Sequence, residues 1–402
     1  MVYVTARFPF GPGEAFVIPE LRALAGMGFE VLLVPVLPSG SIVHPDAAEF
    51  VARTWAASLL SPRVLGGAAR SIFRHPGRSA RAALRAIVGQ RPRIVAKNLA
   101  VIPKGLWLAD LVAREGVSHI HAYWASTAGT IALVAATVSG VRMSMTAHSW
   151  DIGEANCLEA KVDRSVVTRV ISIDGRSELL GRISASVARR VQLLHLGVAM
   201  PEEVPVQSAT QILRVVVPAA FEPFKGHAVL IAAARLLQAA GIEVSFLLVG
   251  DGPLRKAVEA AAAHAGVDGM IAFAGQMAHT DLLARYDAGD VDAVLLPSVT
   301  QTDGSREGIP ISLVEAMARS IPVIGTTCGG IPELLAEEAG ILVPEGQPAA
   351  LADAVAELYR QPSLRRALGA VGRARVQADF DSALQTSRLC TAAGIAASAG
   401  LT

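Results

Sequence analysis

Two carboxylate side chains, Glu307 and Glu315, stand with seven residues between them in the stretch 305–335. Carboxylates accept hydrogen bonds from hydroxyl groups, so this pair can contact two hydroxyls of one elongated polar ligand. The pattern predicts a loop that runs into a helix through Glu315. Because a helix start offers free backbone N–H groups and positive charge, it suits a diphosphate. The predicted loop and helix start consist of Arg306, Glu307, Gly308, Ile309, Pro310 and Ile311.

A second junction of the same kind follows closely. Residues 322–326 read as a strand, and the Gly-Gly-Ile-Pro turn at 329–332 starts another predicted helix near Glu333. Glycine lets the backbone approach a ligand closely. The two junctions therefore predict a site for a sugar nucleotide. The alternative is an ordinary helix start, in which Glu307 compensates the helix dipole and Glu315 is solvated.

The spacing of the two glutamates and the following PVIGTTCGGIPEL resemble the donor-binding signature of retaining glycosyltransferases of family 4. The resemblance implies that Glu307 contacts the transferred sugar and Glu315 the ribose, while the amides between them hold the diphosphate. Lys225, in a Lys-Gly-His sequence, resembles the family's catalytic lysine. The family's partner arginine is replaced by Ala220 in this chain. We expect Arg306 or another basic group to supply the missing charge.

The resemblance also implies a reaction course. The anomeric configuration is retained, with attack on the same face as the leaving group, and the leaving phosphate accepts the acceptor's proton. The sequence offers no recognisable carboxylate nucleophile for a double displacement. It shows no cluster of metal-ligand residues either, since the three cysteines are scattered. We expect no metal and no cofactor, with the nucleoside diphosphate sugar as donor substrate.

Two segments in the first half of the chain are candidates for the acceptor side of a cleft. A strand at 2–8 runs into a Gly/Pro loop with Gly11, Gly13 and Glu14, in a segment similar to members of the family that build exopolysaccharides. The glycines either approach a ligand or make the turn. A strand at 143–148 ends in TAHSWDI, which resembles the family's acceptor-domain motif and implies a catalytic His148 and a nearby Asp151. Otherwise His148 is a core histidine and Asp151 a helix cap.

Composition and periodicity predict an α/β fold in two domains. A chain of 402 residues exceeds the usual size of one core, and strands alternate with helices in both halves. The resemblance implies the GT-B fold, with two Rossmann-like doubly wound domains facing across a cleft. We expect an acceptor-binding domain at 1–199, a linker at 200–211, a nucleotide-sugar domain at 212–375, and a helical tail at 376–402 that packs back on the first domain.

Charge is distributed unevenly although the net charge is only +1. Residues 61–104 hold ten Lys/Arg and no Asp or Glu. This segment predicts a basic amphipathic surface for an anionic membrane, or else a solvated basic region. No aromatic interleaving or recognised module points to nucleic acid. Mean hydropathy is +0.44, yet no apolar run is long enough to span a bilayer, and no signal segment is evident. We expect a cytoplasmic protein, peripheral on the inner face of the membrane.

The sequence thus favours a glycosyltransferase that moves a hexosyl group to a glycan or lipid-linked acceptor in cell-surface glycan synthesis. Two alternatives stay open. One is another GT-B activity such as sugar-nucleotide epimerisation. The other is a catalytically silent nucleotide-sugar-binding subunit, for which Ala220 is the main argument. A nicotinamide enzyme is disfavoured because the G-x-G-x-x-G fingerprint is missing.

Overall fold

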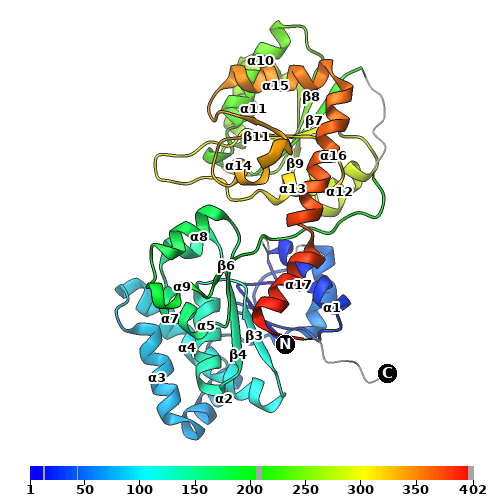
Figure 1. Ribbon diagram of the computed structural model, residues 1–402. Helices are drawn as coiled ribbons and strands as arrows, with labels where there is room; N and C mark the ends of the chain where they lie inside the picture. Colours follow the sequence, from blue (N-terminus) through cyan, green and yellow to red (C-terminus); the bar gives the residue numbers. More distant parts are fainter. Residues whose placement is uncertain (12–13, 43, 205–210, 397–402) are drawn as a thin grey trace. The chain divides into compact units, whose positions relative to one another are not determined.

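The computed structural model describes residues 1–11, 14–42, 44–204 and 211–396. The chain divides into two compact units (Figure 1). Unit 1 comprises Met1–Gly197 and Ser382–Thr402, and unit 2 comprises Val198–Asp381. The predicted tail boundary at 376 falls inside α16 (Pro362–Asp379), which belongs to unit 2. Only the last helix, α17 (Ser382–Ala393), returns to unit 1, where it packs beside α1 (Ile18–Gly26).

Unit 1 is built on a six-stranded sheet in the order β2-β1-β3-β4-β5-β6, and every neighbouring pair is parallel. The strands are short and mostly buried, as expected for a sheet covered by helices on both faces. They are β1 (Val2–Thr5), β2 (Leu32–Pro35), β3 (His119–Ala122), β4 (Arg142–Ala147), β5 (Thr168–Val170) and β6 (Val191–Leu193).

Helices of unit 1 lie on both sides of this sheet (Figure 1). The long helix α4 (Pro92–Arg114) packs on α5 (Thr127–Ser139), and α5 contacts β1, β3 and β4. The other helical segments are η1 (Ala15–Val17), η2 (Pro45–Arg53), α2 (Pro62–Arg74), α3 (Pro76–Ile87), α6 (Ser149–Glu154), α7 (Leu158–Arg164), α8 (Ile173–Leu180) and α9 (Ala185–Ala188).

The two faces of this sheet differ in polarity, because side chains alternate along each strand. Apolar side chains such as Val4, Ile120 and Met145 enter the core shared with α5. The opposite face carries a hydrogen-bonded polar network. Within it, Arg169 pairs with Glu20 of α1 at 2.7 Å, and both side chains are at least nine-tenths buried. Tyr3, His121, Ser144 and Thr146 continue the network through side-chain hydrogen bonds and ring contacts.

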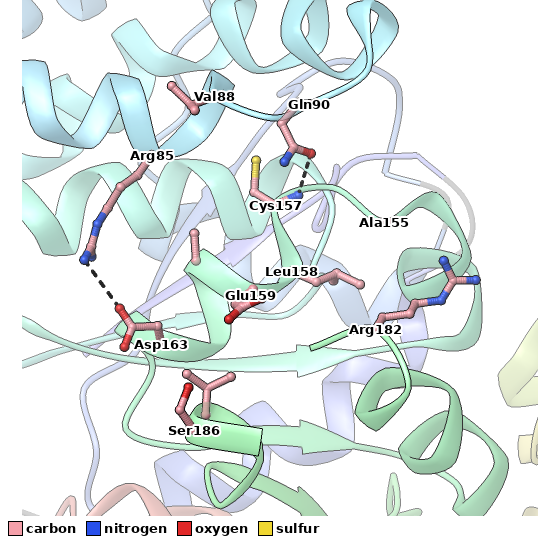
Figure 2. A pocket seen from close by; sticks show the side chains of 12 residues that line it. Arg85, Val88, Gln90, Ala155, Cys157, Leu158, Glu159, Asp163, Arg182 and Ser186 are labelled. Atoms are coloured by element: carbon pink, nitrogen blue, oxygen red, sulfur yellow. Dashed lines mark hydrogen bonds and ion pairs between the residues drawn. The ribbon is translucent and has the colours of Figure 1, made fainter. Parts of the chain in front are cut away.

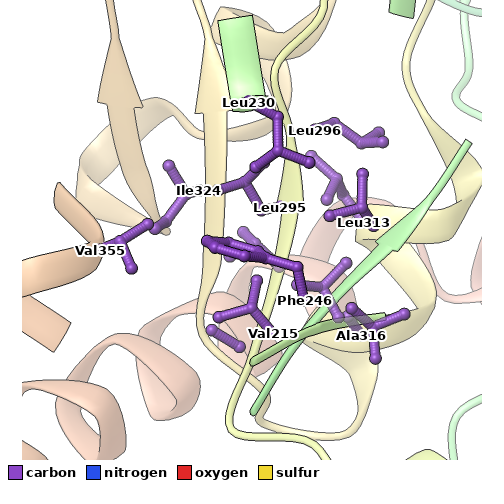
Figure 3. Close-up of a cluster of buried hydrophobic side chains, with 14 of the residues drawn as sticks. Val215, Leu230, Phe246, Leu295, Leu296, Leu313, Ala316, Ile324 and Val355 are labelled. Atoms are coloured by element: carbon purple, nitrogen blue, oxygen red, sulfur yellow. The ribbon is translucent and has the colours of Figure 1, made fainter. Parts of the chain in front are cut away.

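Unit 2 contains a second parallel sheet, in the order β12-β11-β10-β7-β8-β9. Its strands are β7 (Leu213–Pro218), β8 (Val244–Val249), β9 (Ile271–Gly275), β10 (Ala293–Leu296), β11 (Val323–Thr326) and β12 (Ile341–Val343). Valine, leucine and isoleucine dominate these strands and form a core with the surrounding helices. Figure 3 shows Phe246, Leu295 and Ile324 packed together in that core.

Helices alternate with the strands of unit 2 as the sequence predicts. They are η3 (Pro223–Lys225), α10 (His227–Ala239), α11 (Arg255–His264), η4 (Asp268–Met270), α12 (His279–Asp287), α13 (Ile311–Ala318), α14 (Ile331–Leu334), η5 (Ala336–Glu338), α15 (Pro348–Arg360) and α16. One expectation needs correction. The helix predicted after the Gly-Gly turn, α14, has only four residues, too few to build an appreciable dipole. Across the described ranges, no helix has both the length and the apolar character to cross a membrane.

The buried Arg169–Glu20 pair yields a stability prediction. Glu20→Gln leaves a guanidinium buried without its counter-charge, so we expect the free energy of unfolding of unit 1 to fall by about 3 to 5 kcal/mol. Urea unfolding followed by circular dichroism measures this loss. The more exposed Arg182–Glu178 pair, at 2.9 Å, is the matched control, since Glu178→Gln is expected to cost less than about 1 kcal/mol. Equal losses in the two variants would contradict the prediction.

Candidate functional site

The strand order of unit 2 reverses between β7 and β10. From β7 the chain proceeds through β8 to β9 on one side, and then from β10 through β11 to β12 on the other. Ligands of open α/β sheets bind at the carboxyl ends of the strands at such a reversal, because the two loops diverge there. The loop after β7 holds Lys225 and the loop after β10 holds Glu307. The fold thus brings together two predicted site residues that are 82 positions apart.

Lys225 and Glu307 form an ion pair at this point. The distance from Lys225 Nζ to Glu307 Oε2 is 2.5 Å, with the side chains 15% and 11% exposed. Ser298 donates a second hydrogen bond to the same oxygen at 3.1 Å. Only one carboxylate oxygen of Glu307 is therefore used by these two donors. A polar ligand can bind the other oxygen or exchange with the lysine.

Glycines allow the loops around this pair to touch. A Cβ at Gly226 would lie 1.8 Å from the carbonyl oxygen of Pro297, and one at Gly329 would lie 1.9 Å from that of Glu307. Both glycines have positive φ, 68° and 56°, which strains other residues. Gly330 donates its N–H to the Glu307 carbonyl at 3.3 Å. The backbone that carries Glu307 is thus fixed by the predicted second junction.

Glu315 is the fifth residue of α13, so it lies about one turn into the helix. Its carboxylate contacts His279, with Nε2 and Oε1 2.6 Å apart. His279 begins α12, after β9, and its side chain is 42% exposed. Sequence reasoning missed this histidine. Its place after the carboxyl end of a strand was the available signal, but the partner is 36 residues away.

The remaining predicted donor residues occupy the loop and the start of α13. Gly308 and Ile309 precede Pro310, which is the N-cap of α13, and Ile311 is its first residue. Arg306 is exposed. Ala220, in the place of the family arginine, is also exposed and follows β7.

Unit 1 has its own reversal point, between β1 and β3. Glu14 lies there and is 6% exposed. Its carboxylate accepts hydrogen bonds from the backbone N–H groups of Ala6, Arg7 and Phe8 and from Nε1 of Trp124, at 2.6 to 2.9 Å. Glu14 therefore closes the loop after β1 and ties it to the end of β3. Gly11, at φ 75°, makes the turn in this loop. Gly13 lies outside the described residues.

His148 and Asp151 follow β4. The His148 ring stacks on Trp124 with centroids 4.2 Å apart, and its Nε2 lies 3.1 Å from the carbonyl oxygen of Tyr123. Asp151 Oδ2 accepts the backbone N–H groups of Ala125 and His148 at 3.0 and 3.3 Å. Asp151 thus caps α6 and fixes His148. Among the described residues, Asp151 Oδ1 is buried without a hydrogen-bond partner.

Burial shifts the pKa values of both side chains toward their neutral forms. It lowers the pKa of His148 to about 3, helped by the positive charge of Arg169. It raises the pKa of Asp151 to about 6, against the hydrogen bonds from Ala125 and His148. At neutral pH His148 is therefore an uncharged imidazole, suited to hydrogen bonding with a polar ligand rather than to holding a positive charge. The structure therefore gives His148 the contacts of a core residue and Asp151 those of a helix cap, and both residues belong to the predicted motif.

A hollow of about 680 Å³ also lies in unit 1 (Figure 2). Its wall includes Arg85, paired with Asp163 at 3.4 Å, and Gln90, whose Oε1 accepts the backbone N–H of Cys157. No predicted site residue lines it. Throughout the described part of the chain, no group of three or more His, Cys, Asp or Glu side chains is placed to hold a metal ion.

The raised pKa of Asp151 predicts a pH-dependent stability. A carboxyl whose pKa is higher in the folded state supports folding fully below its unfolded pKa, near 4, and loses that contribution as the pH rises through about 6. Asp151→Asn keeps an acceptor oxygen without the charge. We expect this variant to gain up to about 3 kcal/mol over the parent above that window, and nothing below it. Urea unfolding against pH measures this, with exposed Asp174→Asn as control. A gain that does not change with pH would contradict the assignment.

The chain resembles known proteins in parts and as a whole. Residues 206–375 match the family model described as glycosyl transferases group 1. A putative colanic acid biosynthesis glycosyltransferase, WcaL of Salmonella typhimurium, is 41% identical over 137 residues, which are 34% of this chain and 33% of WcaL. The chain thus aligns with about a third of that relative's length. The amylovoran biosynthesis glycosyltransferase AmsK of Erwinia amylovora is 25% identical over 415 residues, covering 95% of this chain and 96% of AmsK.

Solved structures share the fold over nearly the whole length. Anabaena HepE in complex with UDP superposes with a TM-score of 0.70 at 15% identity, covering 97% of this chain and 99% of HepE. Sucrose-phosphate synthase from Thermosynechococcus elongatus superposes with a TM-score of 0.67 at 21% identity, covering 97% and 98%. Residues 206–375 therefore resemble the group 1 glycosyl transferases in sequence, and the chain has the two-domain α/β fold called GT-B.

Proposed function

We propose that this protein transfers a hexosyl group from a nucleoside diphosphate sugar to a glycan or lipid-linked acceptor, with retention of configuration. The observation that carries the proposal is the Lys225–Glu307 pair at the β7/β10 reversal of unit 2. It combines a cation for a diphosphate with a carboxylate for sugar hydroxyls. The homology of residues 206–375 supports the same assignment.

The pair suggests how a donor is bound. Before donor binds, Glu307 neutralises Lys225 at low exposure, which keeps both charges stable. A diphosphate can take over the ammonium group because it carries more negative charge and more acceptor atoms. Glu307 is then free to accept hydrogen bonds from the sugar hydroxyls, while the free N–H groups at the start of α13 face the phosphates. Glu315 accepts the ribose hydroxyls in this scheme.

Bond making and breaking need little from side chains in this proposal. The bond between the anomeric carbon and the diphosphate oxygen breaks as the acceptor oxygen attacks from the same face. The acceptor's proton passes to the leaving diphosphate, whose charge Lys225 stabilises. The predicted catalytic role of His148 stays part of this proposal. The proposal uses no metal ion, so a chelator should leave the rate unchanged.

The relatives indicate the pathway class. Their names refer to colanic acid and amylovoran biosynthesis, so we propose a role in exopolysaccharide or other cell-surface glycan synthesis. We further propose that the protein works in the cytoplasm, at the inner face of the cell membrane, where it would meet a lipid-linked acceptor. HepE binds UDP and UDP-glucose, and other relatives are named as GDP-mannose-dependent. Both bases therefore belong in the donor tests.

A second candidate is a nucleotide-sugar-binding subunit without turnover. Ala220 favours it, because this residue cannot supply the positive charge that the family arginine would give. Exposed Arg306, next to Glu307, is the candidate replacement in the active enzyme. Donor binding without transfer or slow hydrolysis would select the silent subunit.

Glu307 tests the donor site directly. Purified protein is incubated with a panel of UDP-, GDP- and ADP-sugars while thermal stability and slow donor hydrolysis are followed. We expect one donor to stabilise the parent and Glu307→Ala to lose most of that effect, because the sugar hydroxyls lose their acceptor. Asp353→Ala, at an exposed position of α15, is the control. If every donor stabilises Glu307→Ala as well as the parent, the site lies elsewhere.

Arg306 and Lys225 are tested by the same titration. A charge-assisted hydrogen bond contributes about 1.5 to 3 kcal/mol, so Lys225→Ala should raise the half-saturating donor concentration roughly ten- to a hundredfold. Arg306→Ala should act in the same direction if it replaces the family arginine. An unchanged donor affinity in Arg306→Ala would remove that residue from the site, while the Lys225 result would stand independently.

His279 is expected to act through Glu315. Its ring holds Oε1 and leaves Oε2 for a hydroxyl, so His279→Ala should weaken donor binding roughly fivefold, and a double-mutant cycle with Glu315→Ala should show coupling of about 0.5 to 3 kcal/mol. Isothermal titration measures all four forms, and His279→Gln should rescue in part because it can still donate. Strictly additive effects would show that His279 does not position Glu315.

A further inference from the structure

The carboxylate of Glu14 lies at the strand-order reversal of unit 1 and is only 6% exposed. Its Oε1 accepts the backbone N–H of Ala6 and Nε1–H of Trp124. Its Oε2 accepts the backbone N–H groups of Arg7 and Phe8. An ionised carboxyl group has about four lone-pair positions, and these four donors fill them. Glu14 therefore has no oxygen left for a substrate, so any part that it plays in a reaction passes through its neighbours.

Three of the four donors are consecutive backbone groups. Successive backbone N–H groups that point to one spot form a concave site for an anion. In this chain the anion is a side chain from the same part of the sequence, because Glu14 comes six to eight residues after its backbone partners. Thr5 adds a second closure, since its hydroxyl donates to the Phe8 carbonyl at 2.8 Å. The conformation of the loop after β1 therefore depends on a carboxylate at this spot.

The fourth donor connects Glu14 to the end of β3. Trp124 follows β3, which is a neighbour of β1 in the sheet, and its Nε1 lies 2.6 Å from Glu14 Oε1. A hydrogen bond at the edge of the indole ring fixes the plane of that ring. His148 stacks on this plane, with ring centroids 4.2 Å apart and 28° between the planes. The orientation of the indole therefore determines which way the imidazole faces.

Phe16 contacts the two stacked rings from the side. Its ring meets that of Trp124 at a centroid distance of 6.1 Å and an angle of 76°, and that of His148 at 5.9 Å and 64°. Both are edge-to-face contacts, which aromatic rings favour. Phe16 comes two residues after Glu14, so a displacement of Glu14 would move this contact as well. Two of the ring contacts of His148 thus depend on where Glu14 lies.

We propose that Glu14 is a positioning residue for His148, which acts by filling the anion site of the loop after β1 and by orienting Trp124. The inference rests on the proposed function for the catalytic role of His148. In this role Glu14 does not touch the acceptor, because both of its oxygens already bind the protein. A carboxylate is needed rather than any side chain of the same size, since the amide of glutamine would turn an NH₂ group toward two N–H donors.

Chemical rescue with acetate tests the proposal. Glu14→Ala removes the carboxylate, and acetate is small enough to take its place. We expect kcat for slow donor hydrolysis to fall about ten- to a hundredfold in this variant, because a small displacement of a catalytic group costs about that much. The KM for the donor should stay unchanged, because the proposed donor site lies in unit 2. Added acetate should restore most of the lost kcat, and chloride at the same ionic strength should not.

Glu115→Ala is the matched control for this experiment. Glu115 is an exposed glutamate of unit 1 at the end of α4. This variant should equal the parent in kcat, with and without acetate. A rescue by acetate that also raised the activity of Glu115→Ala or of the parent would be a general salt effect and would count against the proposal.

A spectroscopic measurement follows His148 without turnover. The ring current of the stacked indole shifts the NMR signal of the His148 ring protons, and this signal is assigned by its loss in His148→Gln. We expect it to move toward that of an unstacked histidine in Glu14→Ala, to return with acetate, and to keep its position in Glu115→Ala. Glu14→Gln keeps the size of the side chain, so it should move the signal without a response to acetate, and it replaces Glu14→Ala if that variant does not fold.

Two results would overturn the proposal. One is a His148 signal that keeps its position in Glu14→Ala and Glu14→Gln. The other is a signal that acetate restores while kcat stays low, which would limit Glu14 to closing the loop. A parent protein that hydrolyses no donor would count against the proposed function instead, and the His148 signal would still decide whether Glu14 positions the ring.

Discussion

The reversal of strand order in unit 2 is the constraint on which the candidate site depends. Strands β7 and β10 are neighbours, but the chain leaves them in opposite directions. The loops at their carboxyl ends therefore diverge and leave space between them. Glycines then let those loops touch, at Gly226 and Gly329. Lys225 and Glu307 meet only because of this arrangement. A larger residue at either glycine would clash with the backbone of the facing loop and push the two loops apart.

The two units use equivalent positions differently. In unit 1 the reversal between β1 and β3 is occupied by the protein's own groups, because Glu14 accepts four hydrogen bonds from the loop after β1 and from Trp124. Trp124 in turn supports the His148 ring. In unit 2 the carboxylate of Glu307 has two donors among the described residues, Lys225 and Ser298, so it keeps capacity for a ligand. A carboxylate such as Glu14, whose acceptor capacity is used by the protein, stabilises the surrounding loops. A carboxylate such as Glu307, with acceptor capacity left, can bind a ligand.

Local patterns predicted the elements well and the tertiary partners poorly. The strand expected at 322–326 is β11 at 323–326, and the strand expected at 143–148 is β4 at 142–147, since apolar runs and turn residues are local signals. Trp124, which donates to Glu14, is 110 residues away from it, and Asp110, which pairs with Arg70, is 40 residues away. The sequence around Glu14 and Arg70 gives no sign of these distant partners. The buried position of Glu14 and the neutralisation of Arg70 can therefore be seen only in the structure.

In the proposed function, the Lys225–Glu307 pairing in the unliganded state also limits the free energy that donor binding can gain. Lys225 and Glu307 are both largely buried, and a buried charge left alone is costly. A ligand that carries only a phosphate would pair with the lysine and leave the glutamate buried without a counter-charge. A free sugar would bind the glutamate and leave the lysine without one. A nucleoside diphosphate sugar satisfies both groups in one step. In the proposed function, the pair therefore favours the intact donor over either of its halves, and this selectivity arises from electrostatics without a tightly shaped pocket.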